Sequence, residues 1–261
     1  MREKDRNVRL DLAGIRVLAD VVNSDILTEA LAGYEDSRLS LSAPEIRVHT
    51  TLEDIEAQRE QMLSLWAEEG IEIPNANDAF YEFACLLPKI LEEAVLHRVI
   101  YMHGSAVSLN GQGYLFTAPS GTGKSTHARL WREQFGDEVV MINDDKPLLR
   151  FTEDEIYLCG SPWNGKHGLG CPMEAPLRGI VRLRRGEINE IEPMSQAETV
   201  KELYLRTYRF KDRAKMQIVM ELIGSIVEKV PCYSLRCNME PEAAEVARRG
   251  VTGDRFLKTD N

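Results

Sequence analysis

The sequence predicts an α/β protein with a mixed sheet and flanking helices, and three observations support this. Strand-like and helix-like segments alternate along the 261 residues. Hairpin patterns recur among them, which indicates antiparallel as well as parallel pairing. Between residues 113 and 142, an apolar strand, a glycine-rich loop, an amphipathic helix and a second apolar strand follow in order. We expect a small N-terminal α/β region over residues 1–75 and a larger domain over residues 76–261.

The N-terminal region has local patterns of strands and one helix but no motif that indicates a function. The predicted elements are a hairpin over residues 7–22 that turns at Ala13 and Gly14, a strand over 45–50 and a helix over 51–70. Thr51 is the expected N-cap of the helix, Asp54 lies close to the capping-box position, and Gly70 is the expected stop. Residues 71–78 are expected to form a linker.

The larger domain begins with a helix that has a broad apolar face and a kink predicted at Pro88. The expected elements are that helix over residues 79–96, a hairpin of strands 98–110 and 113–118, a loop and helix over 119–135, strands over 139–142, 147–151 and 156–159, a hairpin over 179–194 that turns at Gly186, helices over 197–208 and 212–230, a strand over 231–237 and a helix over 241–248. Several hairpins among the helices favour a mixed sheet over a simple doubly wound one.

Composition excludes several classes of function. A net charge of −10 disfavours sequence-independent nucleic-acid binding, which needs a basic surface. No apolar stretch reaches membrane-spanning length, and the charged N-terminus is unlike a signal peptide. Five scattered cysteines without a C-x-x-C pair suggest neither a zinc site nor a disulfide framework. We therefore expect a reduced, cytoplasmic protein that binds neither nucleic acid nor membrane.

The segment A-P-S-G-T-G-K-S-T, residues 118–126, predicts a phosphate-binding loop. Ala118 stands where the motif usually has its first glycine. Gly121 and Gly123 allow successive N–H groups to turn toward phosphate oxygens, and the following helix adds its positive dipole end. Lys124 is expected to bridge the β- and γ-phosphates, and the Ser125 hydroxyl to ligate Mg²⁺. The predicted nucleotide-binding residues are Ser120, Gly121, Thr122, Gly123, Lys124, Ser125 and Thr126. The competing interpretation is an ordinary glycine-rich turn.

Two adjacent carboxylates, Asp144 and Asp145, follow the strand after the loop helix. Ligands bind outside the carboxyl ends of strands in sheets of this type, so the pair is expected beside the phosphates. One carboxylate can hold Mg²⁺ and the other can accept a proton from an attacking hydroxyl. A solvated turn before Pro147 is the alternative interpretation.

Weaker candidates surround these motifs. Strand pairing could bring His103 of H-G-S-A toward the phosphates, although a lone histidine is usually structural. In G-S-P-W-N-G-K-H-G, residues 160–168, Trp163 could cover a base or substrate and Lys166 could meet the γ-phosphate or an acidic acceptor. A surface loop with Trp163 packed on the core fits equally well. Further cationic candidates, for which exposed charge is the plainer interpretation, are Arg182, Arg184, Arg185, Arg206 and Arg209. For His127 and Trp131, packing against the sheet is expected.

Together, H-G-S-A, A-P-S-G-T-G-K-S-T and N-D-D resemble the HPr kinase/phosphorylase family and its relatives, the ATP-dependent phosphoenolpyruvate carboxykinases. The resemblance covers about residues 99–150. It implies a P-loop fold with a mixed sheet, and ATP and Mg²⁺ as cofactors. It also implies that Lys124 and Ser125 bind the phosphates and the metal. It further implies Asp144 as the base that activates an acceptor hydroxyl, Asp145 near a metal, and His103 beside the transferred phosphate or a second metal.

Departures from the family limit what the resemblance implies. The chain is much shorter than the carboxykinases and has no counterpart of their substrate arginines, so decarboxylation is not expected. It also lacks a clear form of the signature that bifunctional HPr kinases carry, which makes HPr itself a doubtful acceptor. The family often forms rings or dimers, so a homo-oligomer is compatible with the resemblance.

The function implied is Mg-ATP-dependent transfer of a phosphoryl group to a hydroxyl, foremost a serine, of a protein, peptide or small molecule. The sequence leaves open whether ATP, ADP or pyrophosphate is the donor, and which of Asp144 and Asp145 is the base. Two alternatives stay open: a non-catalytic nucleotide-binding regulatory module, and a P-loop NTPase of another class.

Overall fold

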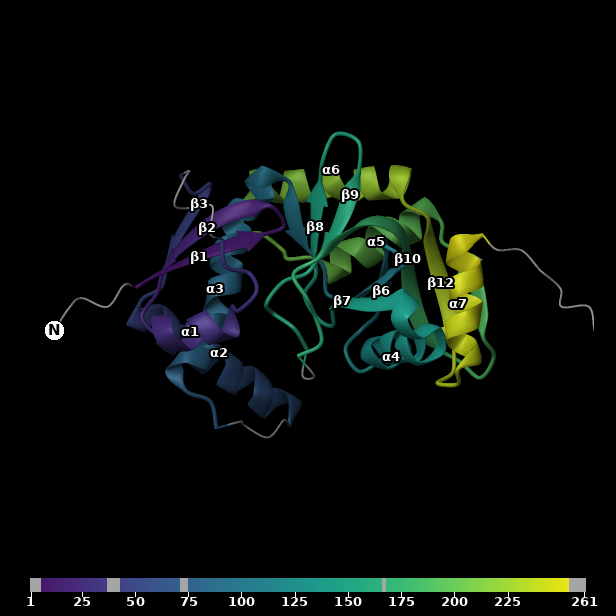
Figure 1. The fold of residues 1–261 in the computed structure, drawn as a ribbon, viewed down its shortest axis with the longest axis horizontal. Helices are drawn as coiled ribbons and strands as arrows, with labels where there is room; N and C mark the ends of the chain where they lie inside the picture. The colour runs from purple at the N-terminus through teal and green to yellow at the C-terminus, as the bar shows by residue number, and fades with distance from the viewer. Residues whose placement is uncertain (1–5, 37–42, 71–74, 166–167, 254–261) are drawn as a thin grey trace, which may run out of the picture. The chain divides into compact units, whose positions relative to one another are not determined.

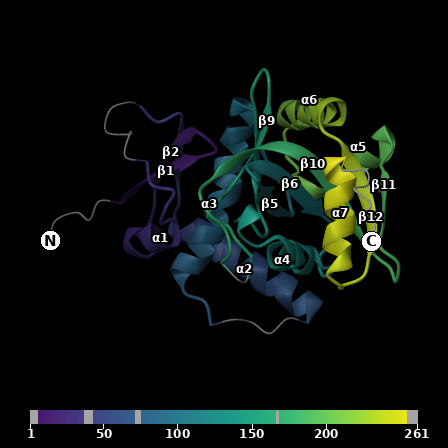
Figure 2. The same cartoon turned by 45° about the vertical axis from the view of Figure 1, so that its right-hand side comes forward.

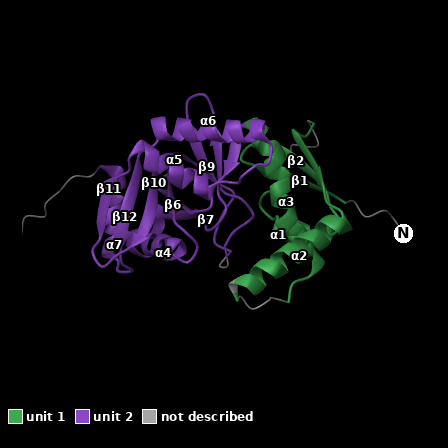
Figure 3. Cartoon of the chain, turned by 180° about the vertical axis from the view of Figure 1, so that it is seen from behind, with its two compact units in different colours: residues 1–97 green, residues 98–261 purple. Residues whose placement is uncertain are grey.

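In a computed structural model, the chain forms two compact units, residues 1–97 and 98–261 (Figures 1 and 3). The structure describes residues 6–36, 43–70, 75–165 and 168–253. Each unit combines helices with a sheet of its own, so the prediction of an α/β protein is confirmed. Across these four ranges, no helix has the length and apolar character that crossing a bilayer requires.

Unit 1 is a three-stranded sheet with helices. Its elements are β1 (Asn7–Leu12), β2 (Ile15–Asp20), α1 (Ser24–Ala30), β3 (Ile46–His49), α2 (Leu52–Glu69), α3 (Asp78–Ala94) and the short 3₁₀ helix η2 (Val95–His97). β1 and β2 form the predicted hairpin, and β3 pairs parallel to β2. The capping box of Thr51 with Asp54 is present, and Gly70 ends α2 at φ 65°. The predicted hairpin, the strand over residues 45–50 and the helix over residues 51–70 are therefore confirmed. The helix α1 was not predicted, and the expected linker over residues 71–78 lies partly outside the described residues.

The buried carboxylate of Glu82 ties α3 to the rest of unit 1. It accepts hydrogen bonds from the backbone N–H groups of Val22 (2.6 Å) and Asn23 (2.9 Å) and from the Thr50 hydroxyl. α3 also packs on α1, α2 and β3. The boundary between units therefore falls after residue 97, whereas the sequence placed it at residue 75, because the partners of Glu82 are not visible in the local pattern.

Replacing Glu82 with alanine should destabilise unit 1. Four donors, among them the Asn23 side-chain amide, would lose a buried acceptor. This loss should lower the free energy of unfolding by about 2–4 kcal/mol. Hydrogen exchange of the β1–β3 amides in the full chain measures this, with Glu93→Ala at an exposed position of the same helix as the control. Equal exchange rates in the two variants would show that the carboxylate does not hold α3 in place.

Unit 2 contains a nine-stranded mixed sheet in the order β4-β8-β9-β10-β6-β5-β7, with β12 paired to β10 and β11 to β12. Its elements are β4 (Val99–Tyr101), β5 (Ser105–Leu109), β6 (Gln112–Thr117), α4 (Lys124–Phe135), the 3₁₀ helix η3 (Gly136–Glu138), β7 (Val139–Asn143), β8 (Leu148–Phe151), β9 (Ile156–Cys159), β10 (Glu174–Arg185), β11 (Glu190–Pro193), α5 (Gln196–Arg206), α6 (Arg213–Lys229), β12 (Cys232–Cys237) and α7 (Glu242–Thr252).

Two predicted hairpins differ from the structure. β10 and β11 flank the predicted turn at Gly186 but do not pair with each other. β12 lies between them, parallel to β10 and antiparallel to β11. The predicted long strand over residues 98–110 is divided into β4, which pairs with β8, and β5, which forms the expected hairpin with β6. Turn residues mark where a chain reverses, but strand partners are decided by packing.

The strand order brings the chemistry-bearing segments to one edge of the sheet. β5 lies between β6 and β7 and is antiparallel to both. Ser105 at the start of β5 pairs with Phe116 near the end of β6, and Ala106 pairs with Asn143 at the end of β7. The loop after β6, the acid pair after β7 and His103 before β5 consequently share this edge.

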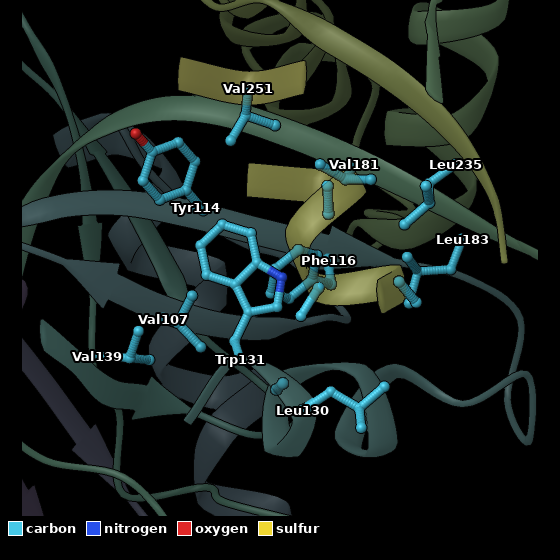
Figure 4. Packing of buried hydrophobic residues seen from close by; sticks show 14 of the residues in the cluster. Val107, Tyr114, Phe116, Leu130, Trp131, Val139, Val181, Leu183, Leu235 and Val251 are labelled. Atoms are coloured by element: carbon cyan, nitrogen blue, oxygen red, sulfur yellow. The ribbon is translucent and has the colours of Figure 1, made fainter. Parts of the chain in front are cut away.

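The core of unit 2 is an apolar cluster between the sheet and two helices, α4 and α7, which lie side by side (Figures 2 and 4). Trp131 of α4 is fully buried, with its ring 5.2 Å from Phe116 and 5.6 Å from Tyr114. Its indole N–H donates to Nε2 of His127 at 3.1 Å. The expectation that both α4 side chains pack against the sheet is confirmed, and this packing fixes the helix that follows the loop.

Acid should destabilise unit 2 through His127. Burial lowers the pKa of this imidazole from 6.5 to about 3. Below pH 6.5 the unfolded chain takes up a proton that the folded chain does not, so stability falls as pH falls. Between pH 7 and pH 5 the loss from this group is about 2 kcal/mol. Urea unfolding followed by tryptophan fluorescence should show that the free energy of unfolding falls less between pH 7 and pH 5 in His127→Gln than in the wild type. Equal losses in the two proteins would show that His127 does not cause the acid destabilisation.

Candidate active site

The loop between β6 and α4 has an open inner side. Gly121 and Gly123 have φ values of 73° and 120°, and a Cβ built on either would meet no atom within 4 Å. Ala118 is fully buried and is not among the described non-glycine residues with positive φ, so alanine is tolerated at the first glycine position. No side chain caps α4, so its first N–H groups are suited to an anion.

Lys124 is the buried cation of the loop. Its Nζ donates to the carbonyl oxygens of Ala118 at 3.1 Å and Pro119 at 3.5 Å. Burial lowers the pKa of Lys124, and the carboxylate of Asp145 partly offsets that effect. The ammonium thus lies beside the loop and interacts electrostatically with both aspartates. The other predicted loop residues range from exposed to half-buried: Ser120, Gly121, Thr122, Gly123, Ser125 and Thr126.

Asp144 is a buried carboxylate, only 5% exposed. The Ser105 hydroxyl donates to its Oδ1 at 3.0 Å and so fixes its orientation. A Cβ on Gly165 would lie 3.2 Å from Oδ2, so the glycine leaves space beside that oxygen. A carboxylate held by one neutral donor in this way can still accept a proton through its second oxygen.

Asp145 lies beside Lys146 and His103. Lys146 Nζ donates to its Oδ2, and His103 Nε2 lies 3.6 Å from its Oδ1. Burial, followed by the charge of Lys124, lowers the pKa of His103, which favours the neutral imidazole. The Gly104 N–H donates to the Asp145 carbonyl at 3.1 Å. The structure therefore brings together His103, Lys124 and both aspartates, and it gives the two acids different surroundings.

Gly104 explains part of the H-G-S-A motif. A Cβ at this position would lie 2.8 Å from the Phe116 carbonyl oxygen and 2.7 Å from a Leu115 methyl carbon. Only glycine allows the start of β5 to approach β6 this closely. His103 is held on its other side by its N–H, which donates to the Arg206 carbonyl at 2.7 Å.

Asn143, which the sequence reasoning missed, shapes the turn that carries the acids. Its side chain is fully buried, and its Oδ1 accepts from the N–H groups of Asp145 (2.8 Å) and Lys146 (2.6 Å). Its Nδ2 donates to the Ser161 carbonyl at 2.9 Å, and Ser161 Oγ donates to the Lys146 carbonyl at 2.6 Å. The sequence signal was an asparagine at a strand end before two N–H groups that need an acceptor.

Of the five arginine candidates, Arg209 is exposed and the other four divide into two groups. Arg185 of β10 donates to the loop carbonyl of Gly121 at 2.5 Å, and Arg206 at the end of α5 pairs with Glu202 at 2.8 Å in a largely buried contact. The Arg206 carbonyl accepts from the His103 N–H, which places Arg206 near the site. In contrast, Arg182 and Arg184 pair with surface glutamates.

Residues 160–165 hydrogen-bond to the turn that carries the acids. Trp163 is only 4% exposed, so its ring packs in the interior, and its carbonyl lies 3.5 Å from Asn143 Nδ2. This placement favours the packing role over contact with a base or substrate. Lys166 lies outside the described residues.

Two cavities flank α4. One, of about 500 Å³, borders the loop and the ends of β10 and β12; its lining includes Gly121, Gly123, Leu130, Leu183, Arg185 and Met239. The other, of about 430 Å³, contains Ser125 and Asp144. Residues at the start of α4 line both cavities.

The oxygen donors at this edge are of the kind that bind Mg²⁺ when a nucleotide supplies the remaining ligands. Ser125 offers an exposed hydroxyl and Asp145 a half-exposed carboxylate. Within the described ranges, no group of three or more histidine, cysteine, aspartate or glutamate side chains could hold a metal by itself. Mg²⁺ commonly binds through one or two protein oxygens together with phosphates and water, which suits this sparse set.

Comparison with known proteins adds little to this geometry. No family model matches the sequence, and no curated protein matches it. Among solved structures, the HPr(Ser) kinase/phosphatase from Coxiella burnetii is similar over 59% of this chain and 97% of its own, at 13% identity and a TM-score of 0.35. That TM-score is too low to carry an argument about fold or activity.

Proposed function

We propose that the chain is an Mg-ATP-dependent kinase that phosphorylates a hydroxyl group. The observation that carries this is the meeting of the glycine-rich loop, the acid pair and His103 at one sheet edge, through the pairing of β5 with β6 and β7. A phosphate-binding loop alone would fit any NTPase. A buried, oriented carboxylate beside it adds a group that can take the proton of a hydroxyl.

The donor nucleotide would bind across the loop. Loop N–H groups and the N-terminus of α4 would hold the phosphates, and Lys124 would contact the β- and γ-phosphates. The nucleoside would enter the cavity of about 500 Å³, where Leu130 and Leu183 supply apolar surface. Mg²⁺, held by Ser125 and Asp145, would offset the charge of the phosphates.

In the transfer step, the acceptor oxygen attacks the γ-phosphorus and forms the new P–O bond. The bond to the β–γ bridging oxygen breaks, and ADP leaves with the electron pair. The hydroxyl proton passes to Asp144, which Ser105 holds in position. Lys124 stabilises the charge on the transferring group, and His103 stays neutral beside Asp145.

The test is transfer of label from γ-labelled ATP. The full chain is incubated with Mg²⁺, labelled ATP and a cell extract, and the labelled product is then identified. We expect one acceptor to be labelled at a hydroxyl, and EDTA to abolish the labelling. Nucleotide binding without transfer to any acceptor would instead support the regulatory module, and release of inorganic phosphate alone would support an NTPase.

A further inference from the structure

The cavity of about 430 Å³ beside α4 joins the proposed catalytic groups to two arginines. Its lining includes Ser125, Arg129 and Arg132 from α4, Met141 and Asp144 from β7 and the turn after it, and Leu169. Of all the lining residues, only Ser125 and Thr126 belong to the proposed nucleotide-binding loop. The space is therefore open to a second ligand.

The α4 residues form one stripe along the helix. Ser125, Arg129 and Arg132 are spaced by four and three residues, so they share a face. At a rise of about 1.5 Å per residue, Arg132 lies roughly 10 Å along the axis from Ser125. The cavity thus has a catalytic end near Ser125 and Asp144 and a cationic end near Arg132.

The charges of the two ends differ in a way that suits an acidic ligand. Arg129 pairs with Glu133 at 2.7 Å, which neutralises part of its charge. The guanidinium of Arg132 makes no ion pair with any residue in the described part of the chain. The lining also includes Met141 and Leu169, which offer apolar surface to a carbon skeleton.

We propose that this cavity binds the acceptor, and that the acceptor is a small molecule with a hydroxyl at one end and a carboxylate or phosphate at the other. The inference rests on the proposed kinase function and specifies its substrate class. The hydroxyl lies at Asp144, and Arg132, with Arg129, binds the acidic group through charge-assisted hydrogen bonds. The cationic end is needed because an acidic acceptor must approach Asp144 and the donor phosphates, which repel it.

The size of the cavity favours a small molecule over a protein segment. About 430 Å³ lies in the range of sites that enclose metabolite-sized ligands. The separation of the two ends also suits a ligand of a few carbon atoms between hydroxyl and acid, since the arginine side chains reach back along the helix.

The test is calorimetric titration of matched probes into the full chain saturated with Mg²⁺ and a non-hydrolysable ATP analogue. The probes are 4-hydroxybutyrate against 1,4-butanediol and glycerol 3-phosphate against glycerol; each pair shares hydroxyl chemistry and differs in the acidic group. We expect an acidic probe to bind at millimolar concentration and its neutral counterpart not to bind. The affinities of 4-hydroxybutyrate and glycerol 3-phosphate show whether the site prefers a carboxylate or a phosphate.

Variants separate the roles of the arginines. Arg132→Gln should weaken binding of the acidic probe about tenfold or more, and Arg129→Gln less, since Glu133 already engages Arg129. Arg249→Gln removes an equal charge from an exposed site on α7 and should leave the affinity unchanged. An unchanged affinity in Arg132→Gln, or no preference for acidic probes, would overturn the proposal.

Nucleotide affinity distinguishes this inference from the proposed function. If the ATP analogue binds and no acidic probe does, the acceptor assignment fails and the kinase proposal stands. If the analogue itself does not bind, the kinase proposal fails. Label transfer to a protein in the cell extract would also overturn the small-molecule assignment.

Discussion

Replacing Asp144 with asparagine should nearly abolish phosphoryl transfer and leave ATP affinity almost unchanged. The amide oxygen can still accept the Ser105 hydroxyl hydrogen bond, so the local structure is preserved. The amide cannot take up the proton of the acceptor hydroxyl. General base catalysis contributes roughly 10²- to 10⁴-fold, so label transfer should fall by that factor. Transfer rates and nucleotide affinity are measured on the same preparations.

Asp145→Asn is the matched control because it changes the adjacent acid by the same atoms. Asp145 contacts Lys146 and lies near His103, and in the proposed mechanism it binds the metal and does not take the proton. This variant should need more Mg²⁺ for half-maximal transfer, whereas Asp144→Asn should keep the Mg²⁺ dependence of the wild type. If Asp144→Asn changed the Mg²⁺ dependence and Asp145→Asn did not, the two roles would be exchanged. If Asp144→Asn transferred phosphate at the wild-type rate, Asp144 would not be the base.

Helices and strands whose start and stop signals lie within their own segment were predictable from the sequence. The helix after Thr51 starts where its capping box requires and ends at Gly70, because both signals lie within the segment itself. The strand, glycine-rich loop and helix from β6 to α4 follow the same logic. The mixed character of the sheet was also predictable, since hairpin turns imply antiparallel neighbours.

Pairing between distant segments was not predictable. β12 lies between β10 and β11, although those two strands are close in sequence and separated by a turn. The pattern of a hairpin was present, but the preference for β12 as partner comes from packing against α7 and the rest of the cluster. The division of the chain after residue 97 has the same cause, since the partners of Glu82 are distant in sequence.

In the candidate site, too, contacts between side chains that are distant in sequence were not predictable. Lys124 and the acid pair could be nominated because their residue types and order are informative. Asn143, Ser105 and Ser161 act by holding other groups, and a holding role is visible only when the held atom is known. Residues that position a candidate reactive group were therefore missed, while the candidates themselves could be named from the sequence.

Removing the amine of Lys124 should cost both nucleotide binding and turnover. In the Lys124→Ala variant, the phosphates lose a charge-assisted partner worth about 1.5–3 kcal/mol, which is roughly 10- to 100-fold in affinity. Turnover should fall further, because the amine is expected to stabilise charge that grows during transfer. Calorimetry with the ATP analogue and label transfer measure the two losses separately.

Lys124→Met separates the charge of Lys124 from its packing. The lysine stem is buried and its Nζ donates to the carbonyls of Ala118 and Pro119, so alanine also removes contacts that hold the loop. Methionine keeps most of the apolar stem and removes the ammonium. If both variants lose affinity equally, the charge is responsible; if Lys124→Met binds the analogue as the wild type does, the loop does not use this residue to bind phosphate.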